Sequence, residues 1–245
     1  ALRSDVEQMS HMSGHNLQVY AGMIASLDRS VGKIIEKLKD LNIYGKTMII
    51  FTSDNGGANY IELEDINKPF RGWKISFFEG GIRVPFIVSW PDKISPGLTS
   101  NSAVHHFDIF PTIVSAAKTT TSNKKELDGV NLLPYIKKEN SEEPHETLFW
   151  RSGNHQSVLH KKWKYIVSKK ENKSWLFDTS VDPLEKNNLI ESHPKEAQKI
   201  EELLVQFNSE QKEPLFPSAF EAPIMIDKYD GQAYEEGDEY IYWSN

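Results

Sequence analysis

Asp54 and Asn55 stand side by side directly after the apolar run 47–52, and two glycines follow them. They offer carboxylate and amide oxygens, the hard ligands that Ca²⁺ takes in proteins, and one segment rarely supplies a complete set of them. The pair therefore indicates part of a calcium site, with further carboxylates expected from elsewhere. The same residues are also typical of a tight turn, because Asn and Gly tolerate positive φ angles. The residues alone leave both interpretations open.

Lys74 closes the segment Arg71-Gly72-Trp73-Lys74 and precedes the turn 79–81. A lysine on a short, glycine-flanked loop can direct a compact positive charge at an oxyanion. The alternative is an ordinary solvated lysine. Trp73 can stack on a sugar ring or belong to the core, and the pattern does not separate these roles.

Two further groups of residues invite a functional interpretation that their spacing does not support. His105 and His106 precede Asp108, but neighbouring residues point in different directions and no third ligand has a spacing that suits zinc. Glu79-Gly80-Gly81, with Arg83 nearby, is predicted to be a structural turn with an internal ion pair.

The elements that must position Asp54 and Asn55 are a long helix and short buried strands. Apolar residues recur every three or four positions over 15–41, which predicts an amphipathic helix with one stripe against a core. The runs 47–52 and 86–90 are rich in β-formers and predict strands covered on both faces. This order predicts an α/β fold, in which ligands gather beyond the carboxyl ends of strands.

The second half of the chain has a different pattern of predicted elements. A helix is predicted over 108–117, with Asp108 as its cap and Pro111 in its first turn, followed by the polar segment 118–128. The polar stretch 137–147 divides the predicted domains, 1–145 and 146–245. Short strands at regular spacing then predict a small antiparallel sheet with a helix packed on it: 148–150, 157–159, 164–167 and 175–178, then the helix 194–210 capped by Ser192. The acidic tail from 221 is expected to pack back irregularly.

Composition excludes several classes of protein. The 35 acidic and 28 basic residues give a net charge of −7, which argues against a nucleic-acid partner. No apolar run approaches the roughly 20 residues that span a bilayer. There is no cysteine, and the chain starts with alanine, without an initiating methionine or an apolar signal core in its first ten residues. We therefore expect the chain to be processed or part of a longer one.

Several segments of the chain, taken in the order in which they occur, resemble the sulfatase family of the alkaline-phosphatase-like superfamily. The likeness is to its formylglycine-dependent members. The likeness covers about residues 1–210. It rests on these segments: 20–32, 49–57, 71–74, 78–86, 108–112, and Asp178 with 182–189.

The resemblance implies a mixed sheet flanked by helices, followed by the small C-terminal sheet. It implies that Asp54 and Asn55 are Ca²⁺ ligands and that Lys74 contacts a sulfate oxygen. Trp73, next to Lys74, is a candidate substrate-binding residue on its own chemistry, because an aromatic face can stack on a sugar. It also implies a sulfuric ester hydrolase that acts on sulfated carbohydrate or aryl sulfates in a periplasmic or secreted setting.

The family's nucleophile is a formylglycine made in a Cys/Ser-x-Pro-x-Arg motif, which these 245 residues lack. The two early aspartates of the calcium site and a histidine are also missing. The resemblance therefore implies the C-terminal half of a sulfatase, with an N-terminal half as its partner and no activity of its own. The alternatives are a metal-dependent phosphatase or phosphodiesterase of the same superfamily, or a non-catalytic carbohydrate-binding remnant.

Overall fold

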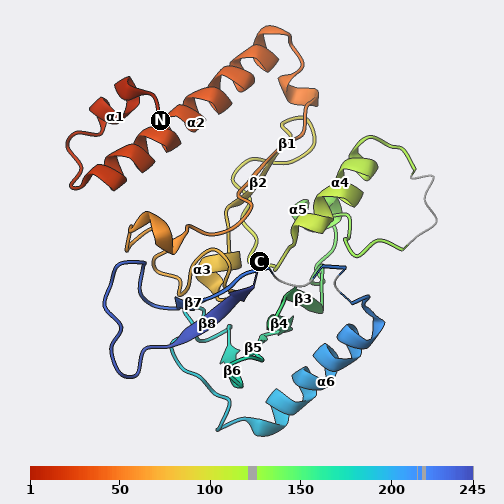
Figure 1. Cartoon of the computed structure of the whole chain (residues 1–245). Helices are drawn as coiled ribbons and strands as arrows, with labels where there is room; N and C mark the ends of the chain where they lie inside the picture. Colours follow the sequence, from red (N-terminus) through yellow and green to blue (C-terminus); the bar gives the residue numbers. More distant parts are fainter. Residues whose placement is uncertain (121–125, 214, 217–218, 245) are drawn as a thin grey trace. The chain divides into compact units, whose positions relative to one another are not determined.

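A computed structural model describes residues 1–120, 126–213, 215–216 and 219–244 and has the predicted mixed α/β character (Figure 1). The chain forms two compact units, which are described separately. The first contains residues 1–11, 19–52 and 86–146, and the second contains 12–18, 53–85 and 147–245. The predicted division into 1–145 and 146–245 differs in placing 53–85 with the first part, and it stays a prediction. Residues 121–125 of the predicted polar segment lie outside the described residues.

The first unit contains the predicted long helix and both predicted early strands. Strands β1 and β2 pair antiparallel, with Ile49 opposite Ser89 and Thr52 opposite Phe86. None of the described helices is long and apolar enough to cross a membrane. The elements are α1 (Arg3–Gln8), α2 (His15–Asp40, whose first four residues belong to the second unit), η1 (Tyr44–Lys46), β1 (Ile49–Thr52), β2 (Phe86–Ser89), η3 (His106–Asp108), α4 (Ile109–Ala116) and α5 (Leu133–Ile136).

The burial predicted for these elements is wrong for the structure as described. The stripe of α2 was expected to face a core, yet Leu27 is 48% exposed and Ile34 is 61% exposed. On the strands, Phe51 is 38% exposed and Ile87 is 57% exposed, although both faces were expected to be covered. The periodicity identified the elements correctly, but the described residues cover them only in part: Gly22 of α2 packs against the backbone of Asp5 in α1, whereas large apolar side chains stay exposed. We call the apolar side chains of α2, β1 and β2 the apolar face.

Asp108 plays a different part from the predicted helix cap. Its buried carboxylate accepts hydrogen bonds from the backbone of His105 at 2.8 Å and of Val130 at 2.9 Å, and it contacts His145 Nε2 at 2.8 Å. These partners leave it no bond to the first turn of α4. Asp108 therefore joins three segments, and Pro111 lies in the first turn of α4 as predicted.

The second unit is built on the predicted antiparallel sheet, in the strand order β3-β4-β5-β6. The C-terminal tail, which was expected to be irregular, forms the hairpin β7–β8. The elements are η2 (Asn59–Ile61), α3 (Glu79–Ile82), β3 (Thr147–Ser152), β4 (His155–His160), β5 (Trp163–Ser168), β6 (Lys173–Asp178), α6 (Pro194–Glu210), β7 (Glu221–Met225) and β8 (Tyr240–Ser244).

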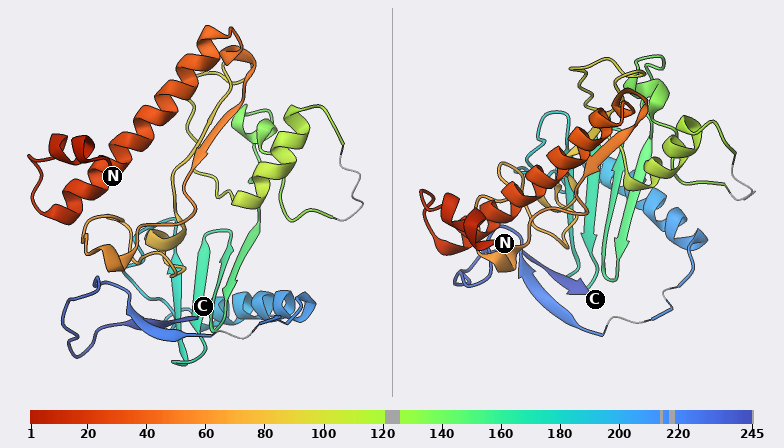
Figure 2. Two further views of the ribbon diagram at one scale, coloured as in Figure 1. Left: turned by 45° about the horizontal axis from the view of Figure 1, so that its top comes forward. Right: turned by 90° about the horizontal axis from the view of Figure 1, so that it is seen from above.

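Side chains alternate between the two faces along each strand of this sheet, and a buried cluster lies on each face. On one face, Tyr165 and Leu176 belong to the cluster that includes Ala197, Ile200 and Leu204 of α6. Figure 2 shows that helix lying against the sheet. On the other face, neighbouring residues of the same strands join Phe78 and the tail; this cluster contains Phe78, Ile166, Trp175, Phe177, Ile226 and Ile241.

Helix α6 begins at Pro194 as predicted, but Ser192 is not its cap. His193 occupies the N-cap position and makes no side-chain cap bond, while the Ser192 hydroxyl donates to the Leu189 carbonyl at 3.2 Å. Proline at the first helical position has no N–H that needs a partner and has a φ angle suited to a helix. It therefore favours a helix start here although no side chain caps it.

Candidate active site

The loop 53–57 carries the two predicted calcium ligands. The Ser53 hydroxyl donates to the Asn55 carbonyl at 2.9 Å, and the Asn55 amide nitrogen donates to the Gly56 carbonyl at 2.8 Å. The second bond uses the nitrogen of the Asn55 side chain, and no hydrogen bond to its amide oxygen is found within the described residues. Asp54 is exposed. The carboxylate of Asp54 and the amide oxygen of Asn55 would thus be ligands for a hard cation, and such a pair suits Ca²⁺ better than a softer metal.

The glycines after Asn55 are required by a close approach of two backbones. The Gly56 amide donates to the Gly81 carbonyl at 2.9 Å, and a β-carbon on Gly56 would overlap the carbonyl of Gly80. Neither Gly56 nor Gly57 has a positive φ angle, so the tight-turn interpretation does not explain them. The glycines bring loop 53–57 against the segment that contains Lys74.

Direct backbone contacts join Lys74 to the same loop. The Lys74 amide donates to the Gly57 carbonyl at 2.9 Å. Asn67 adds a second connection: its side chain accepts from the Gly57 amide at 2.6 Å and donates to the carbonyls of Gly57 at 2.9 Å and Gly72 at 3.1 Å. Gly72 has a φ of +87°, which favours glycine at this bend. The structure therefore brings together the backbones of the two segments that the sequence singled out.

The Lys74 ammonium group differs from the buried lysine of this unit. Lys74 is partly exposed, and in the part of the chain that the structure describes its side chain makes no hydrogen bond or ion pair. Lys164, in contrast, is fully buried and contacts Glu79 at 2.5 Å and Glu185 at 2.7 Å. The ammonium group of Lys74 is therefore accessible to a ligand, whereas that of Lys164 is used in buried ion pairs that hold the fold together.

The Glu79–Lys164–Glu185 network anchors α3, the turn after Lys74. Burial alone would raise the pKa of Glu79, but Lys164 and Arg83 outweigh it and the pKa lies below its ordinary value. Burial is also the largest influence on Glu185, and it raises the pKa of that carboxyl. The Glu79 amide donates to Glu185 at 2.6 Å as well. This confirms the structural interpretation of the Glu79 turn, and Arg83 contacts Glu79 at 3.3 Å.

Trp73 is only 5% exposed, so protein atoms cover its ring faces. This burial favours core packing over the stacking on a sugar that the sequence also allowed. The Trp73 indole nitrogen is buried and has no hydrogen-bond partner among the described residues. Trp73 therefore packs beneath the segment that carries Lys74, and its place beside a substrate stays a prediction.

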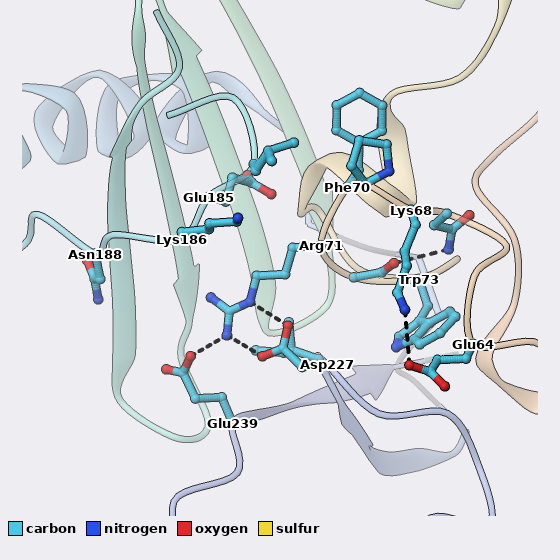
Figure 3. Close-up of a pocket in the computed structure, with 15 residues that line it drawn as sticks. Glu64, Lys68, Phe70, Arg71, Trp73, Glu185, Lys186, Asn188, Asp227 and Glu239 are labelled. Atoms are coloured by element: carbon cyan, nitrogen blue, oxygen red, sulfur yellow. Dashed lines mark hydrogen bonds and ion pairs between the residues drawn. The ribbon is translucent and has the colours of Figure 1, made fainter. Parts of the chain in front are cut away.

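A cavity of about 440 Å³ lies beside the Arg71–Trp73 segment (Figure 3). Residues from the 64–73 loop form one wall, the 184–188 segment forms another, and Ile226, Asp227 and Glu239 of the tail close it. Arg71 lies between the two tail carboxylates in this view. The sequence motif contained Arg71, but no local signal links it to residues more than 150 positions away.

The histidines near Asp108 in the first unit make hydrogen bonds and ring contacts within the protein. Asp108 bonds His145 and two backbone amides, and His105 stacks on Phe107 with ring centroids 3.9 Å apart. Among the described residues, no group of three or more His, Cys, Asp or Glu side chains is arranged to hold a metal ion. Asp54 and Asn55 would therefore need ligands from beyond this set.

Comparison with known proteins identifies the family. A family model described as "Sulfatase" matches residues 3–119, and one described as "N-sulphoglucosamine sulphohydrolase, C-terminal" matches residues 72–213, more than half of the chain. The chain belongs to the sulfatase family. The first match includes Asp54 and Asn55, and both include Lys74.

Individual sulfatases share this similarity over part of their length. Human N-acetylgalactosamine-6-sulfatase is 38% identical over 119 residues, which are 48% of this chain and 23% of that protein. Human steryl-sulfatase is 30% identical over 182 residues, 71% of this chain and 31% of that protein. The solved structure of Ps i-CgsB has a TM-score of 0.79 at 27% identity, covering 88% of this chain and 48% of that one; it has also been solved with k-i-k-neocarrahexaose. The chain thus spans half or less of each of these proteins.

Proposed function

We propose that this chain is the C-terminal portion of an enzyme that hydrolyses sulfate esters of carbohydrates. The observation that carries the proposal is the hydrogen bond from the Lys74 amide to the Gly57 carbonyl, which joins the segment of a partly exposed lysine to the loop of Asp54 and Asn55. Oxygen donors beside an ammonium group suit a ligand in which a cation and an oxyanion meet.

In this proposal, Asp54 and Asn55 hold Ca²⁺ through side-chain oxygens, and Lys74 donates hydrogen bonds to a sulfate oxygen. The calcium ion would neutralise charge on the sulfate group. Lys74 would orient the ester and stabilise the charge that develops on its oxygens, since a compact ammonium group is suited to an oxyanion. Loop 53–57 and its contacts through Asn67 would fix both groups in advance.

The formylglycine nucleophile and the remaining calcium ligands would come from an N-terminal half of the same protein. Two observations support such a partner. The chain covers 48% of the solved relative, and the apolar face of α2, β1 and β2 exposes large side chains such as Ile34 and Ile87. An exposed apolar surface of this kind is typical of a contact with other protein. We therefore expect the 245 residues alone to be inactive.

Sulfated carbohydrate is the preferred substrate class for two reasons. One relative bears the name N-acetylgalactosamine-6-sulfatase, and the structural relative with the TM-score of 0.79 has been solved with an oligosaccharide. Steryl-sulfatase, also similar, is named for a sterol, so the reaction is better supported than the alcohol.

The test is hydrolysis by the full-length protein of 4-nitrophenyl sulfate and of sulfated oligosaccharides, with 4-nitrophenyl phosphate as the comparison. The Lys74→Ala variant should lose about 10²-fold or more in kcat/KM, as expected when one charge-stabilising donor is removed. Lys199→Ala, on the exposed surface of α6, is the control and should keep full activity. A loss below threefold in Lys74→Ala, or a preference for the phosphate ester, would contradict the proposal.

A further inference from the structure

The C-terminal tail is not accounted for by the family resemblance. The two family models end at residues 119 and 213, whereas the hairpin β7–β8 occupies 221–244. The hairpin is nevertheless built into the second unit. Ile226 and Ile241 are each 1% exposed and belong to the same buried cluster as Phe78 and Trp175.

Two tail carboxylates grip Arg71. Asp227 accepts from Arg71 Nε at 2.7 Å and from Nη2 at 2.6 Å, a two-pronged pair that suits a guanidinium group. Glu239 accepts from the same Nη2 (Figure 3). The other oxygen of Glu239 accepts from the Trp175 indole at 2.8 Å. Burial lowers the pKa of Arg71, but Asp227 and Glu239 outweigh it and raise that pKa, so the group stays charged. We call Arg71, Asp227 and Glu239 the clasp.

The clasp acts on the segment that ends at Lys74. Arg71 is three residues before Lys74, and its carbonyl accepts from the Gly80 amide at 2.6 Å. The intervening Gly72 has a φ of +87°, a position with little stiffness of its own. On the other side, Lys74 is held by the Gly57 carbonyl. The segment is therefore fixed by loop 53–57 at one end and by the tail at the other.

We infer that Arg71 is a positioning residue for Lys74 and that the tail, through Asp227 and Glu239, is part of the sulfate site. This inference rests on the proposed role of Lys74. Without the clasp, the Arg71 side chain would lose its charge partners and the glycine bend would gain freedom. A small displacement of the Lys74 ammonium group is enough to lower the rate strongly, because positioning contributes much of such catalysis.

The experiment uses the full-length protein with the double variant Asp227→Asn/Glu239→Gln, which keeps side-chain size and removes the charges. Two measurements are made: kcat and KM for 4-nitrophenyl sulfate, and amide hydrogen exchange over residues 72–76. We expect kcat/KM to fall by about tenfold to a hundredfold and exchange at 72–76 to accelerate. Arg71→Lys should resemble the double variant, because lysine cannot make the two-pronged bond.

The matched control is Lys228→Gln, on the same hairpin. Lys228 bonds Asp238 at 2.7 Å and Glu235 at 3.0 Å and does not touch Arg71. This variant changes the charge and stability of the tail without opening the clasp. Its kcat/KM and its exchange at 72–76 should stay within twofold of those of the wild type.

A cycle with Lys74→Ala separates positioning from a general loss of structure. If the clasp acts through Lys74, opening it in the Lys74→Ala protein should cause little additional loss of kcat/KM. The inference is overturned if the double variant retains kcat/KM within twofold, or if its full loss persists in the Lys74→Ala background. If Lys74→Ala itself remains active, the proposed function fails instead; faster exchange at 72–76 would still support the clasp as the element that orders this segment.

Discussion

The carbonyl oxygen of Gly80 occupies the space in which a side chain on Gly56 would begin. The Gly56 amide also donates to the Gly81 carbonyl at 2.9 Å. This contact holds loop 53–57, with Asp54 and Asn55, against the turn that follows Lys74. The geometry of the candidate site therefore depends on a missing β-carbon as well as on the groups that would bind a ligand.

Gly56→Ala should destabilise the protein and distort the site. The added methyl group meets backbone, which cannot rotate away, so we expect a loss of about 2–3 kcal/mol in the free energy of unfolding. Chemical denaturation of the full-length protein would measure it. Gly32→Ala is the control, because nothing lies within 4 Å of its β-carbon and it is inside α2. That change should stabilise the helix by up to about 1 kcal/mol. Equal effects of the two variants would refute the close-contact argument.

Asp54→Ala should weaken calcium binding. Asp54 and Asn55 supply only part of the proposed ligand set, so losing the one carboxylate should reduce affinity by at least about tenfold. Calorimetric titration of metal-free full-length protein with Ca²⁺ would measure this. Asp65→Ala removes an exposed carboxylate that pairs with Lys68 and should bind Ca²⁺ like the wild type. Stoichiometric zinc in the purified protein would favour the phosphatase alternative instead.

The sequence could predict the local parts of the site and the fold. Asp54, Asn55 and Lys74 stand in short motifs beside recognisable elements, and the period of α2 and the regular strands of the C-terminal sheet reveal their type. Contacts between distant segments leave no such pattern. Arg71 meets Asp227 across 156 positions, and Lys164 meets Glu79 across 85. Each partner alone resembles an ordinary surface charge.

Burial was harder to predict than element type, for a related reason. The alternation in β5 predicts two faces, and here both faces are covered, since Tyr165 is 4% exposed and Ile166 is fully buried. The stripe of α2 is as regular, yet Ile34 is 61% exposed. Periodicity states which side chains share a face. It does not state whether the described residues include a partner for that face.

Lys164→Met should strongly destabilise the protein. The change leaves the carboxylates of Glu79 and Glu185 in a buried site without their ammonium partner, a situation that costs about 3–5 kcal/mol. Denaturation of the full-length protein would measure the loss. Adding Glu79→Gln and Glu185→Gln to Lys164→Met should restore much of it, because the unpaired charges are gone. Lys199→Met breaks only an exposed pair with Glu196 and should change stability by less than about 1 kcal/mol. A small effect of Lys164→Met would contradict the buried network.

His155 should make stability depend on pH below neutrality. Its Nε2 accepts from the Phe77 amide at 3.1 Å, and burial lowers its pKa from the ordinary 6.5 to about 4. Between these values the unfolded chain binds a proton that the native protein does not, so stability falls as the pH drops from 6.5 to about 4. The full difference amounts to about 3 kcal/mol. The test is the free energy of unfolding of wild type and His155→Gln measured across this pH range. In His155→Gln, the slope of that free energy against pH should fall by close to the equivalent of one proton. His11→Gln, a change at an exposed site, should leave the slope unchanged. An unchanged slope in His155→Gln would show that other groups control the acid response.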